Sequence, residues 1–378
     1  MRILMVLEYY PPHIGGVETL FQNLTEKLVR MGHSVDIITC QLPQTKRYEK
    51  KGGVNIHRVR VPGIGKRYWF TFFALPQVWK LAKTCDVVHT TTYNGAFPAL
   101  VVSKLRGKKS IITVHEVFRA MWKNLPYMNW ASATLHRLLE KLVIGLPFDK
   151  YVCDSRYTKN ALRLSGIKDE NLESIHPGLD YELFKPQKTN PSNIRERLNL
   201  KDEFLYLFYG RPGCSKGVEF LIQAVPIISK KIPNSKLLLI LSPEPKRRYK
   251  NILRIIKDLG VREETILLEP VSKDRLPDYI MSANCVVVPS LSEGFGFTAV
   301  EACAMGKPVV ASDVGSLPEV VSGKYVLIPP RSPQAIADAV YSIYIGEVED
   351  RGKKIFDWWE TARKYVRVYE KLLGDAGF

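Results

Sequence analysis

The sequence predicts an α/β protein with two domains, each built around a doubly wound parallel sheet of the Rossmann-like kind. Two observations lead to this prediction. Short apolar runs rich in Val and Ile alternate along the chain with longer segments whose apolar residues recur at helical spacing, the pattern of βα units. The 378 residues suffice for two or three domains, and the pattern stops once, between Pro177 and Leu200, and then resumes.

The first series of elements extends to residue 176. Residues 3–7 (ILMVL) are an expected buried strand, and apolar residues then recur at helical spacing until Gly32, the expected C-cap of a helix. The next strand is expected at Ser34–Cys40. Further strands, each next to a segment of helical period, are expected at 86–89, 110–115, 150–155 and 173–176.

The second series follows Pro177–Leu200, which contains three prolines and is the expected linker. Strands are expected at 204–210, 236–241, 265–269, 285–289 and 308–312, and helices at 217–231, 246–259, 272–282 and 296–305. A helical tail begins at about Pro333. We therefore expect an N-terminal domain of residues 1–180, a C-terminal domain of residues 181–352 and a final helix, residues 353–378.

Composition and charge narrow the class of protein. Hydrophobic residues make up 46% of the chain and charged residues 25%, which excludes a disordered chain or a fibre. Of the net charge of +17, residues 1–180 carry +12. This surplus suits nucleic acid, an acidic membrane surface or phosphorylated substrates, and equally a solvated basic surface. The chain has no signal-like or membrane-spanning apolar run and no Cys-x-x-Cys pair, so we expect a cytoplasmic protein without a metal site.

Residues 66–84 (KRYWFTFFALPQVWKLAKT) interleave six aromatic residues with cations. This composition suits a surface helix that lies on a lipid interface. The alternative is a core helix with a basic rim, and Pro76 should interrupt a long helix in either case. The residues of this expected membrane or acceptor patch are Lys66, Arg67, Trp69, Phe72, Phe73, Trp79 and Lys80.

Two loops that follow strands carry residues suited to phosphate groups. Gly15 and Gly16 lead from the first strand into a helix whose N-terminal amides would be free to meet an anion. Arg211 and Lys216 lie between a strand and a helix, where open α/β sheets bind ligands, and two cations suit a diphosphate. A turn that serves only packing and a pair of exposed surface cations are the alternatives.

The segment PSLSEGFGFTAVEACAMGKPVVASDVG holds two carboxylates, Glu293 and Glu301, around closely spaced glycines. Glycines permit close backbone contact with a hydroxyl-rich ligand, and carboxylates accept hydrogen bonds from sugar or ribose hydroxyls. An ordinary strand-to-helix turn is one alternative. A second is a dinucleotide site for NAD, because Gly294-x-Gly296-x-x-Ala299 matches the glycine fingerprint formally, although such a fingerprint normally opens the first βα unit of a domain.

His115 ends the strand at 110–115. Its imidazole is therefore expected at the carboxyl edge of the first sheet, facing the crevice between the domains, either as a polar contact to the substrate or as a structural histidine.

Taken together, these residues resemble the retaining, nucleotide-sugar-dependent glycosyltransferases of family 4, which have the two-domain GT-B fold. The resemblance runs nearly from end to end. Its segments are GGVE (15–18), TVHE (113–116), VCDSRYTKNAL (152–162), HPGLDYELF (176–184), GRPGCSKG (210–217) and EGFGFTAVEACAMGKPVVAS (293–312). The last of these is the most specific.

The resemblance implies a role for each matching residue. The GGVE turn, through the amide of Gly16, would contact the donor diphosphate from one domain, and Arg211 with Lys216 would grip it from the other. Glu301 would bind the ribose hydroxyls, and His115 would contact the donor sugar near its reacting carbon. Glu293 and the backbone amides of Gly294, Phe295, Gly296 and Phe297 would hold the transferred sugar, with Val271 beside the base. The final helix would cross back to the N-terminal domain.

Two segments depart from the family pattern. A glycine pair often follows the strand at 236–241, where this chain has LSPEPKRRY, and Glu269-Pro270 stands where a glycine is common before Val271. The chain contains no Asp-x-Asp, in agreement with transfer that needs no metal ion and no cofactor.

The expected activity is therefore retaining hexosyl transfer from a UDP- or GDP-sugar to a glycan, lipid or small-molecule acceptor, including a lipid-linked or phospholipid acceptor on the inner face of the membrane. A sugar-nucleotide epimerase or a phosphorylase of the same fold, and an NAD-dependent oxidoreductase, are the alternative enzymes. Nucleic acid is not an expected partner, because the chain has no motif that reads it.

Overall fold

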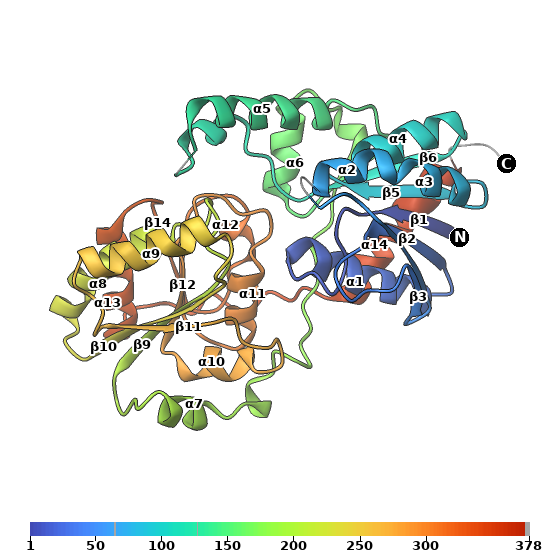
Figure 1. Ribbon diagram of the computed structural model, residues 1–378. Helices are drawn as coiled ribbons and strands as arrows, with labels where there is room; N and C mark the ends of the chain where they lie inside the picture. The colour runs from blue at the N-terminus through green and yellow to red at the C-terminus, as the bar shows by residue number, and fades with distance from the viewer. Residues whose placement is uncertain (64–65, 127, 375–378) are drawn as a thin grey trace. The chain divides into compact units, whose positions relative to one another are not determined.

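The computed structural model describes residues 1–63, 66–126 and 128–374 (Figure 1). The chain divides into two compact units. Unit 1 comprises Met1–Lys123, Asn129–Gly178 and the C-terminal segment from Phe356, and unit 2 comprises Asn124–Met128 and Leu179–Ile355. Each unit is a parallel β-sheet with helices packed against it, so the predicted α/β class is confirmed.

Unit 1 contains an eight-stranded sheet in the order β3-β4-β2-β1-β5-β6-β7-β8. All neighbouring strands are parallel except the β3–β4 pair. The strands are β1 (Arg2–Val6), β2 (Ser34–Cys40), β3 (Tyr48–Lys51), β4 (Val54–Val59), β5 (Val87–Thr91), β6 (Lys109–Val114), β7 (Lys150–Cys153) and β8 (Leu172–Ser174). Because β1, β5, β6 and β7 are neighbours and run the same way, the loops that follow them meet at one edge.

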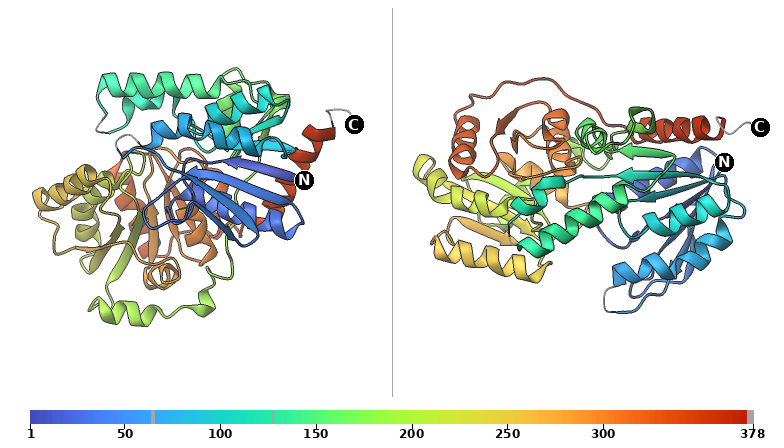
Figure 2. Two further views of the ribbon diagram at one scale, coloured as in Figure 1. Left: turned by 45° about the vertical axis from the view of Figure 1, so that its right-hand side comes forward. Right: turned by 90° about the horizontal axis from the view of Figure 1, so that it is seen from above.

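Helices cover both faces of this sheet (Figure 2). Val88 and His89 are neighbours on β5 and point to opposite faces, as strand geometry requires. On the face of Val88 pack α2 (Lys66–Phe73), α3 (Leu75–Leu81), α4 (Ala96–Leu105), α5 (Trp130–Ile144) and α6 (Arg156–Arg163). On the face of His89 lie α1 (Gly16–Arg30) and α14 (Trp358–Gly374), and the short helices η1 (Arg119–Asn124) and η2 (Asp169–Asn171) lie in loops.

The C-terminal helix α14 is attached to unit 1 by a buried polar network. His89 is fully buried; its Nδ1 lies 2.8 Å from the Tyr369 hydroxyl, and its Nε2 lies 2.8 Å from Oγ1 of Thr113. The Tyr365 hydroxyl lies 3.1 Å from the same Thr113 oxygen. Burial lowers the pKa of His89 to about 3, so the imidazole is neutral at physiological pH and can satisfy its neighbours without a charge.

Unit 2 contains a six-stranded parallel sheet in the order β11-β10-β9-β12-β13-β14. The strands are β9 (Phe204–Gly210), β10 (Ser235–Leu241), β11 (Thr265–Leu268), β12 (Cys285–Val288), β13 (Val309–Ser312) and β14 (Tyr325–Ile328). The helices are η3 (Pro186–Lys188), α7 (Pro191–Arg197), α8 (Val218–Lys231), α9 (Lys246–Asp258), α10 (Leu276–Ser282), α11 (Phe297–Ala304), α12 (Leu317–Val320) and α13 (Pro333–Tyr344). The core packs α8, α9 and α13 against the centre of the sheet, where β9, β10 and β12 are mostly apolar and buried.

Three strands were not predicted: β3, β4 and β14. In β4 only every second residue is buried, because this strand lies near the edge of the sheet and one of its faces is open.

The break at Pro76 is confirmed, since α2 ends at Phe73 and the proline stands in the first turn of α3. In the described part of the chain, no helix has both the length and the apolar character needed to cross a membrane.

The burial of His89 predicts a specific loss of stability in acid. The pKa of His89 is lower in the folded protein than in the unfolded chain, so the unfolded chain takes up a proton first as pH falls below about 6.5. The free energy of unfolding of unit 1 should then fall by about 2 kcal/mol more between pH 7 and pH 5 than in His89→Gln. Urea unfolding followed at both pH values measures the difference, and equal losses in the two proteins would contradict the assignment.

Candidate active site

Three loops meet at the carboxyl edge of the unit 2 sheet. Residues 211–217 follow β9, residues 289–296 follow β12, and residues 313–316 follow β13. The strand β12 lies between β9 and β13, and all three are parallel, so their loops are neighbours. This edge carries Arg211, Lys216 and Glu293, which the sequence predicted as functional residues.

Two glycines let these loops approach more closely than any other residue would allow. A Cβ atom on Gly217 would lie 2.0 Å from the carbonyl oxygen of Pro289, and one on Gly315 would lie 2.3 Å from the carbonyl oxygen of Glu293. Both glycines also have positive φ, +62° and +59°. The loop after β12 is therefore held between its two neighbours through backbone contacts.

Glu293 and Lys216, predicted to act on different parts of a ligand, form an ion pair. Nζ of Lys216 lies 2.7 Å from Oε2 of Glu293, and the Ser290 hydroxyl donates to the same oxygen at 3.1 Å. The Glu293 carbonyl accepts hydrogen bonds from the amide of Ser316 at 3.0 Å and from its hydroxyl at 3.2 Å. The carboxylate of Glu293 is thus fixed in position at a partly exposed site. Ser290 and Ser316 were not predicted, because isolated serines carry no signal in the sequence.

Glu301 lies in the middle of α11 and contacts the end of β9. The Tyr209 hydroxyl lies 2.9 Å from Oε2 of Glu301 and 3.0 Å from the carbonyl oxygen of Thr298. Burial raises the pKa of Glu301 to about 7, and the hydrogen bond from Tyr209 and the positive charge of Lys273 oppose this rise. The carboxyl group therefore changes charge near neutral pH. Lys273 lies in the loop that follows β11 and contains Val271, so this loop also acts on Glu301 electrostatically.

The other predicted residues of unit 2 surround this cluster. Arg211 is exposed on the loop that carries Lys216, and Val271 is partly exposed after the edge strand β11. Gly296 is the N-cap of α11 in a left-handed conformation, and the ring of the buried Phe295 meets that of Phe297 edge to face, with ring centroids 5.0 Å apart. Gly294, Phe295, Gly296 and Phe297 therefore place the N-terminus of a helix beside Glu293.

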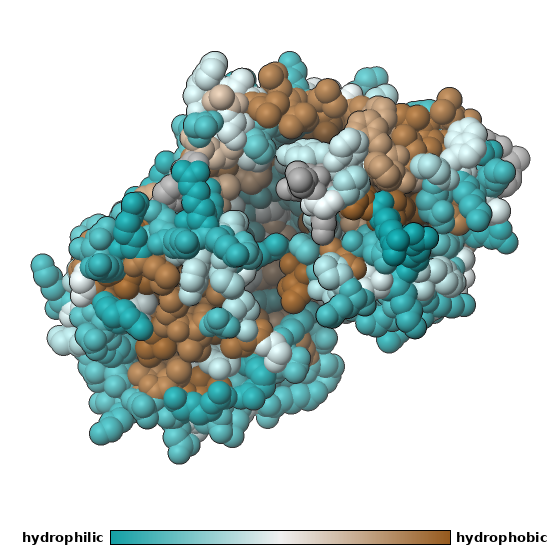
Figure 3. All heavy atoms as spheres, in the orientation of Figure 1, coloured by the Kyte–Doolittle hydropathy of each residue, from teal (hydrophilic) through white to brown (hydrophobic). Residues whose placement is uncertain are grey.

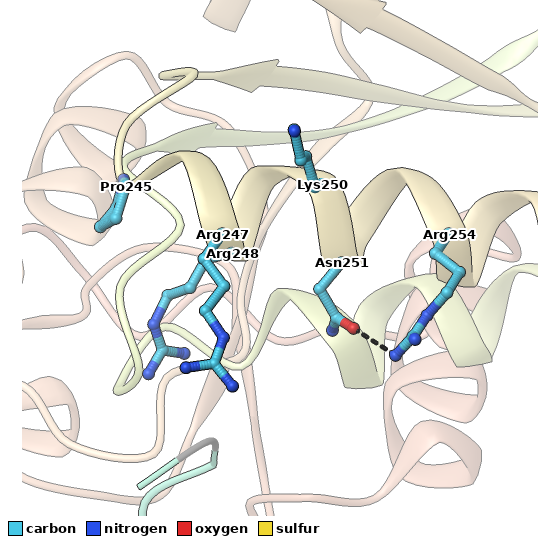
Figure 4. A pocket seen from close by; sticks show the side chains of 6 residues that line it. All are labelled: Pro245, Arg247, Arg248, Lys250, Asn251 and Arg254. Carbon is cyan, nitrogen blue, oxygen red and sulfur yellow. Dashed lines mark hydrogen bonds between the residues drawn. The ribbon is translucent and has the colours of Figure 1, made fainter.

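A group of cations at the same edge was not predicted. Where the chain departs from the family's glycine pair, α9 begins, and its cations line a cavity of about 550 Å³ (Figure 4). Arg247 and Arg248 extend side by side from its first turn, and the Arg254 guanidinium donates to the Asn251 side chain at 2.7 Å. The amide of Ser242, which precedes α9, donates to the Gly210 carbonyl at 3.3 Å, so these cations follow the strand next to β9. The signal, the cationic run KRRYK separated by four residues from the end of β10, was visible in the sequence.

In unit 1, three neighbouring strands bring His115, Asp154 and Thr91 together at the carboxyl edge. Nδ1 of His115 lies 2.6 Å from Oδ2 of Asp154, and Nε2 lies 2.7 Å from Oγ1 of Thr91. The ring of Phe21 packs edge-on against the imidazole, with ring centroids 6.1 Å apart. Asp154 and Thr91 were not predicted, because they follow different strands and only the strand order β5-β6-β7 makes them neighbours of His115.

The chemistry of Asp154 fixes the protonation of the imidazole. An ionised carboxylate only accepts hydrogen bonds, so Nδ1 of His115 carries a proton and donates it to Asp154. In the neutral ring Nε2 is then an acceptor, and the Thr91 hydroxyl donates to it. The other oxygen of Asp154, Oδ1, is buried and has no hydrogen-bond partner among the described residues. The side chain of Asp154 thus orients His115 and fixes its tautomer.

The predicted glycine turn of unit 1 forms the start of α1. Gly15 is the N-cap, with extended backbone and no capping side chain, and Gly16 is the exposed first residue of the helix. Just before them, Nδ1 of His13 lies 2.7 Å from Oε1 of Glu18, and the His13 ring stacks on Tyr9. The turn therefore presents backbone N–H groups at the carboxyl end of β1.

The aromatic residues of the predicted membrane patch lie on the surface and not in the core. Trp69, Phe72, Phe73 and Trp79 are exposed, whereas Phe70 and Val78, on the other faces of α2 and α3, are fully buried. Lys80 is exposed. The side chains of Lys66 and Arg67 lie outside the described residues.

Comparisons with known proteins identify the family of the chain. The family model of Glycosyltransferase Family 4 matches residues 14–183, and the model of Glycosyl transferases group 1 matches residues 190–358. An uncharacterized glycosyltransferase of Methanocaldococcus jannaschii is 29% identical, over 98% of both chains. The GDP-mannose-dependent alpha-(1-6)-phosphatidylinositol monomannoside mannosyltransferase of Mycolicibacterium smegmatis is 25% identical, over 84% of this chain and 82% of its own.

Solved structures show the same fold. Sucrose-phosphate synthase from Thermosynechococcus elongatus superposes with a TM-score of 0.79 and 23% identity, over 99% of this chain and 100% of its own. The Anabaena protein HepE, in complex with UDP-glucose, superposes with a TM-score of 0.73 and 17% identity, over 100% of this chain and 99% of its own. The two parallel-sheet units have the GT-B fold of these glycosyltransferases, which confirms the predicted fold. The chain belongs to the glycosyltransferases that the family 4 and group 1 models together describe.

The close loop contacts of unit 2 lead to a matched pair of substitutions. Gly217→Ala should destabilise unit 2 by at least about 2 kcal/mol more than Gly260→Ala, because both positions have φ near +60° but only Gly217 faces a backbone oxygen. At Gly260 no atom lies within 4 Å of the added Cβ, so this variant reports the strain of the left-handed conformation alone. Urea unfolding of both variants measures the difference. Equal destabilisation would show that the loops do not depend on this contact.

Proposed function

We propose that this protein is a retaining glycosyltransferase that moves a hexose from a UDP- or GDP-sugar to a hydroxyl of a lipid-linked or phospholipid acceptor at the inner face of the membrane. The observation that carries the proposal is the cluster at the carboxyl edge of unit 2. There a fixed carboxylate, Glu293, and the cations Arg211 and Lys216 lie on loops that meet, and a second carboxyl group, Glu301, lies in the helix that follows one of these loops.

The cations suit a diphosphate. Lys216 is paired with Glu293, and an incoming diphosphate would compete for its ammonium group, with the exposed Arg211 as a second donor. Arg247 and Arg248 on the neighbouring α9 add positive potential that attracts a dianionic ligand. Fixed cations at this point would stabilise the charge that develops on the leaving group, which is the task of a metal ion in other enzymes. We therefore propose transfer without a metal ion or cofactor.

The carboxylates suit hydroxyl groups. Glu293, held by Lys216 and Ser290 through one oxygen, would accept hydrogen bonds from the transferred sugar, whose other contacts would come from the amides of residues 294–297. Glu301 would bind the ribose hydroxyls, and Val271, in a loop whose charge already acts on Glu301, would lie beside the base. The structurally similar HepE forms a complex with UDP-glucose, which supports a nucleotide-sugar ligand for this chain.

In unit 1 we assign Gly15 and Gly16 to the donor diphosphate and His115 to the donor sugar. With its proton held on Nδ1 by Asp154, His115 would stabilise positive charge near the reacting carbon. In a same-face displacement the bond from the anomeric carbon to the phosphate oxygen breaks, and a bond to the acceptor oxygen forms on that face. The proton of the acceptor hydroxyl passes to the departing phosphate. Glu293 has no nucleophilic role in this scheme.

The acceptor is assigned from the relatives and from unit 1. The Mycolicibacterium smegmatis relative is, by its name, a GDP-mannose-dependent mannosyltransferase of phosphatidylinositol monomannoside. The exposed aromatic residues of α2 and α3, Trp69, Phe72, Phe73 and Trp79, with Lys80, are suited to a lipid interface, and most of the net positive charge lies in the same half of the chain.

Donor binding can be tested by thermal shift. With EDTA present, the purified protein should be stabilised by nucleotide sugars of one class among UDP-, GDP- and ADP-sugars. Arg211→Ala with Lys216→Ala should abolish the shift, because the diphosphate loses its cations. The control, Lys201→Ala with Lys230→Ala, removes two exposed cations elsewhere in unit 2 and should keep the shift. No shift with any sugar nucleotide but one with NAD would overturn the proposal, and turnover of the donor without an acceptor would indicate an epimerase or a phosphorylase.

Donor affinity should also depend on the charge of Glu301. Only the ionised carboxylate accepts hydrogen bonds from both ribose hydroxyls, so the affinity should fall about tenfold from pH 8 to pH 6, across the pKa of about 7. The intact sugar nucleotide does not titrate in this range. Glu301→Gln should bind more weakly at pH 8 and show no such dependence. Calorimetric titrations at both pH values measure this, and equally flat profiles in the two proteins would refute the ribose assignment.

A further inference from the structure

Exposed apolar side chains gather on one face of unit 1. Among the described residues, thirteen of the twenty-two large hydrophobic residues that are exposed belong to α2–α6, the helices on the Val88 face of the sheet. Figure 3 shows this apolar surface along α5 and toward α4. The residues of α2 and α3 belong to the predicted aromatic patch, but those of α5 do not.

The helix α5 is amphipathic, but its leucines face away from the core. Its buried side holds Ala133, Glu140 and Ile144, whereas three leucines on the outward side, three and four residues apart, are 55% (Leu135), 60% (Leu138) and 61% (Leu142) exposed. Residues at this spacing form one stripe along a helix. Trp130, at the start of the helix, is 75% exposed. An apolar stripe that faces away from the core indicates a surface that another apolar phase covers.

Cations accompany this stripe. A cavity of about 620 Å³ lies between η1, α5 and α6, and Arg119, Arg137 and Lys141 line it. The one acidic residue of α5, Glu140, also lines the cavity, but its two oxygens accept hydrogen bonds from the amides of Phe118 at 2.8 Å and Arg119 at 2.7 Å. The cavity therefore offers three exposed cations, while its carboxylate is already engaged by the backbone.

We propose that the outward face of α5 docks onto an anionic lipid bilayer, with Leu135, Leu138 and Leu142 among the acyl chains and a lipid phosphate among Arg119, Arg137 and Lys141. Charge favours this occupant over a second copy of the chain. Two copies that met through this face would bring like charges together, whereas anionic headgroups would neutralise them. The inference deepens the proposed function, on which it rests for a membrane-bound acceptor, by adding a docking surface that lies outside the predicted patch.

Vesicle binding tests the proposal. The full-length protein should co-sediment with phosphatidylcholine vesicles that contain about 30% phosphatidylglycerol, and weakly with phosphatidylcholine alone. Leu135→Ser, Leu138→Ser and Leu142→Ser together should lower the partition coefficient by about tenfold or more, because three apolar side chains no longer enter the interface. Arg119→Ala, Arg137→Ala and Lys141→Ala together should remove most of the preference for phosphatidylglycerol, by at least about tenfold.

Two control variants match these changes. Leu253→Ser with Leu259→Ser removes exposed leucines of unit 2, and Lys46→Ala, Lys50→Ala and Lys51→Ala remove three exposed cations near β3 of unit 1. Both should bind vesicles nearly as the native protein does. Unchanged binding by the α5 leucine variant, or a native protein that ignores phosphatidylglycerol, would overturn the proposal. The proposal would also be overturned if analytical ultracentrifugation showed that the native protein is a dimer and the leucine variant a monomer.

The docking surface and the donor site can fail separately. The leucine and cation variants of α5 alter only unit 1, so they should keep the thermal shift that nucleotide sugars produce through unit 2. Vesicle binding without any nucleotide-sugar shift in the native protein would leave the docking surface standing and refute the proposed transferase. A normal nucleotide-sugar shift without vesicle binding would refute the docking surface and leave the proposed transferase standing.

Discussion

The loops at the carboxyl edge of the unit 2 sheet pass one another at distances that leave no room for a Cβ atom. Gly217 against the Pro289 carbonyl and Gly315 against that of Glu293 create this close contact. This contact fixes the positions of two residues of the candidate site, Lys216 and Glu293. Lys216 precedes one of these glycines, and Glu293 is the residue that the other one faces, so the ion pair between them follows from backbone packing and not from the flexibility of two long side chains.

Unit 1 brings functional groups together by a different route. Thr91, His115 and Asp154 each end or follow a separate strand, and the parallel order β5-β6-β7 makes them neighbours. His89 lies two residues before Thr91 on β5, and its side chain forms a hydrogen bond with Tyr369 of α14. The same strand therefore supports the candidate site at its carboxyl end and anchors the end of the chain through a residue further inside the sheet.

Burial has opposite electrostatic consequences in the two units. The pKa of His89 falls to about 3, so a buried histidine serves as a neutral structural group. The pKa of Glu301 rises to about 7, so a carboxyl group at the sheet edge can change charge under ordinary conditions. Desolvation favours the neutral form in both cases, and its functional meaning depends on whether the group faces a helix or an open edge. The outward leucines of α5 show the complementary feature, an apolar surface left without cover.

The sequence by itself determined the βα alternation, the limits of most strands, the loops that carry Arg211, Lys216 and Glu293, and the helix that carries Glu301, because strand and helix periods and glycine-rich turns are local properties. The edge strands β3 and β14 and the strand β4 beside β3 escaped it; in β4 one open face weakens the apolar pattern. Only the tertiary structure decided that Lys216 pairs with Glu293, that Tyr209 contacts Glu301 and that Asp154 holds His115. These partners are far apart in the chain, and strand order, which no local pattern encodes, makes them neighbours.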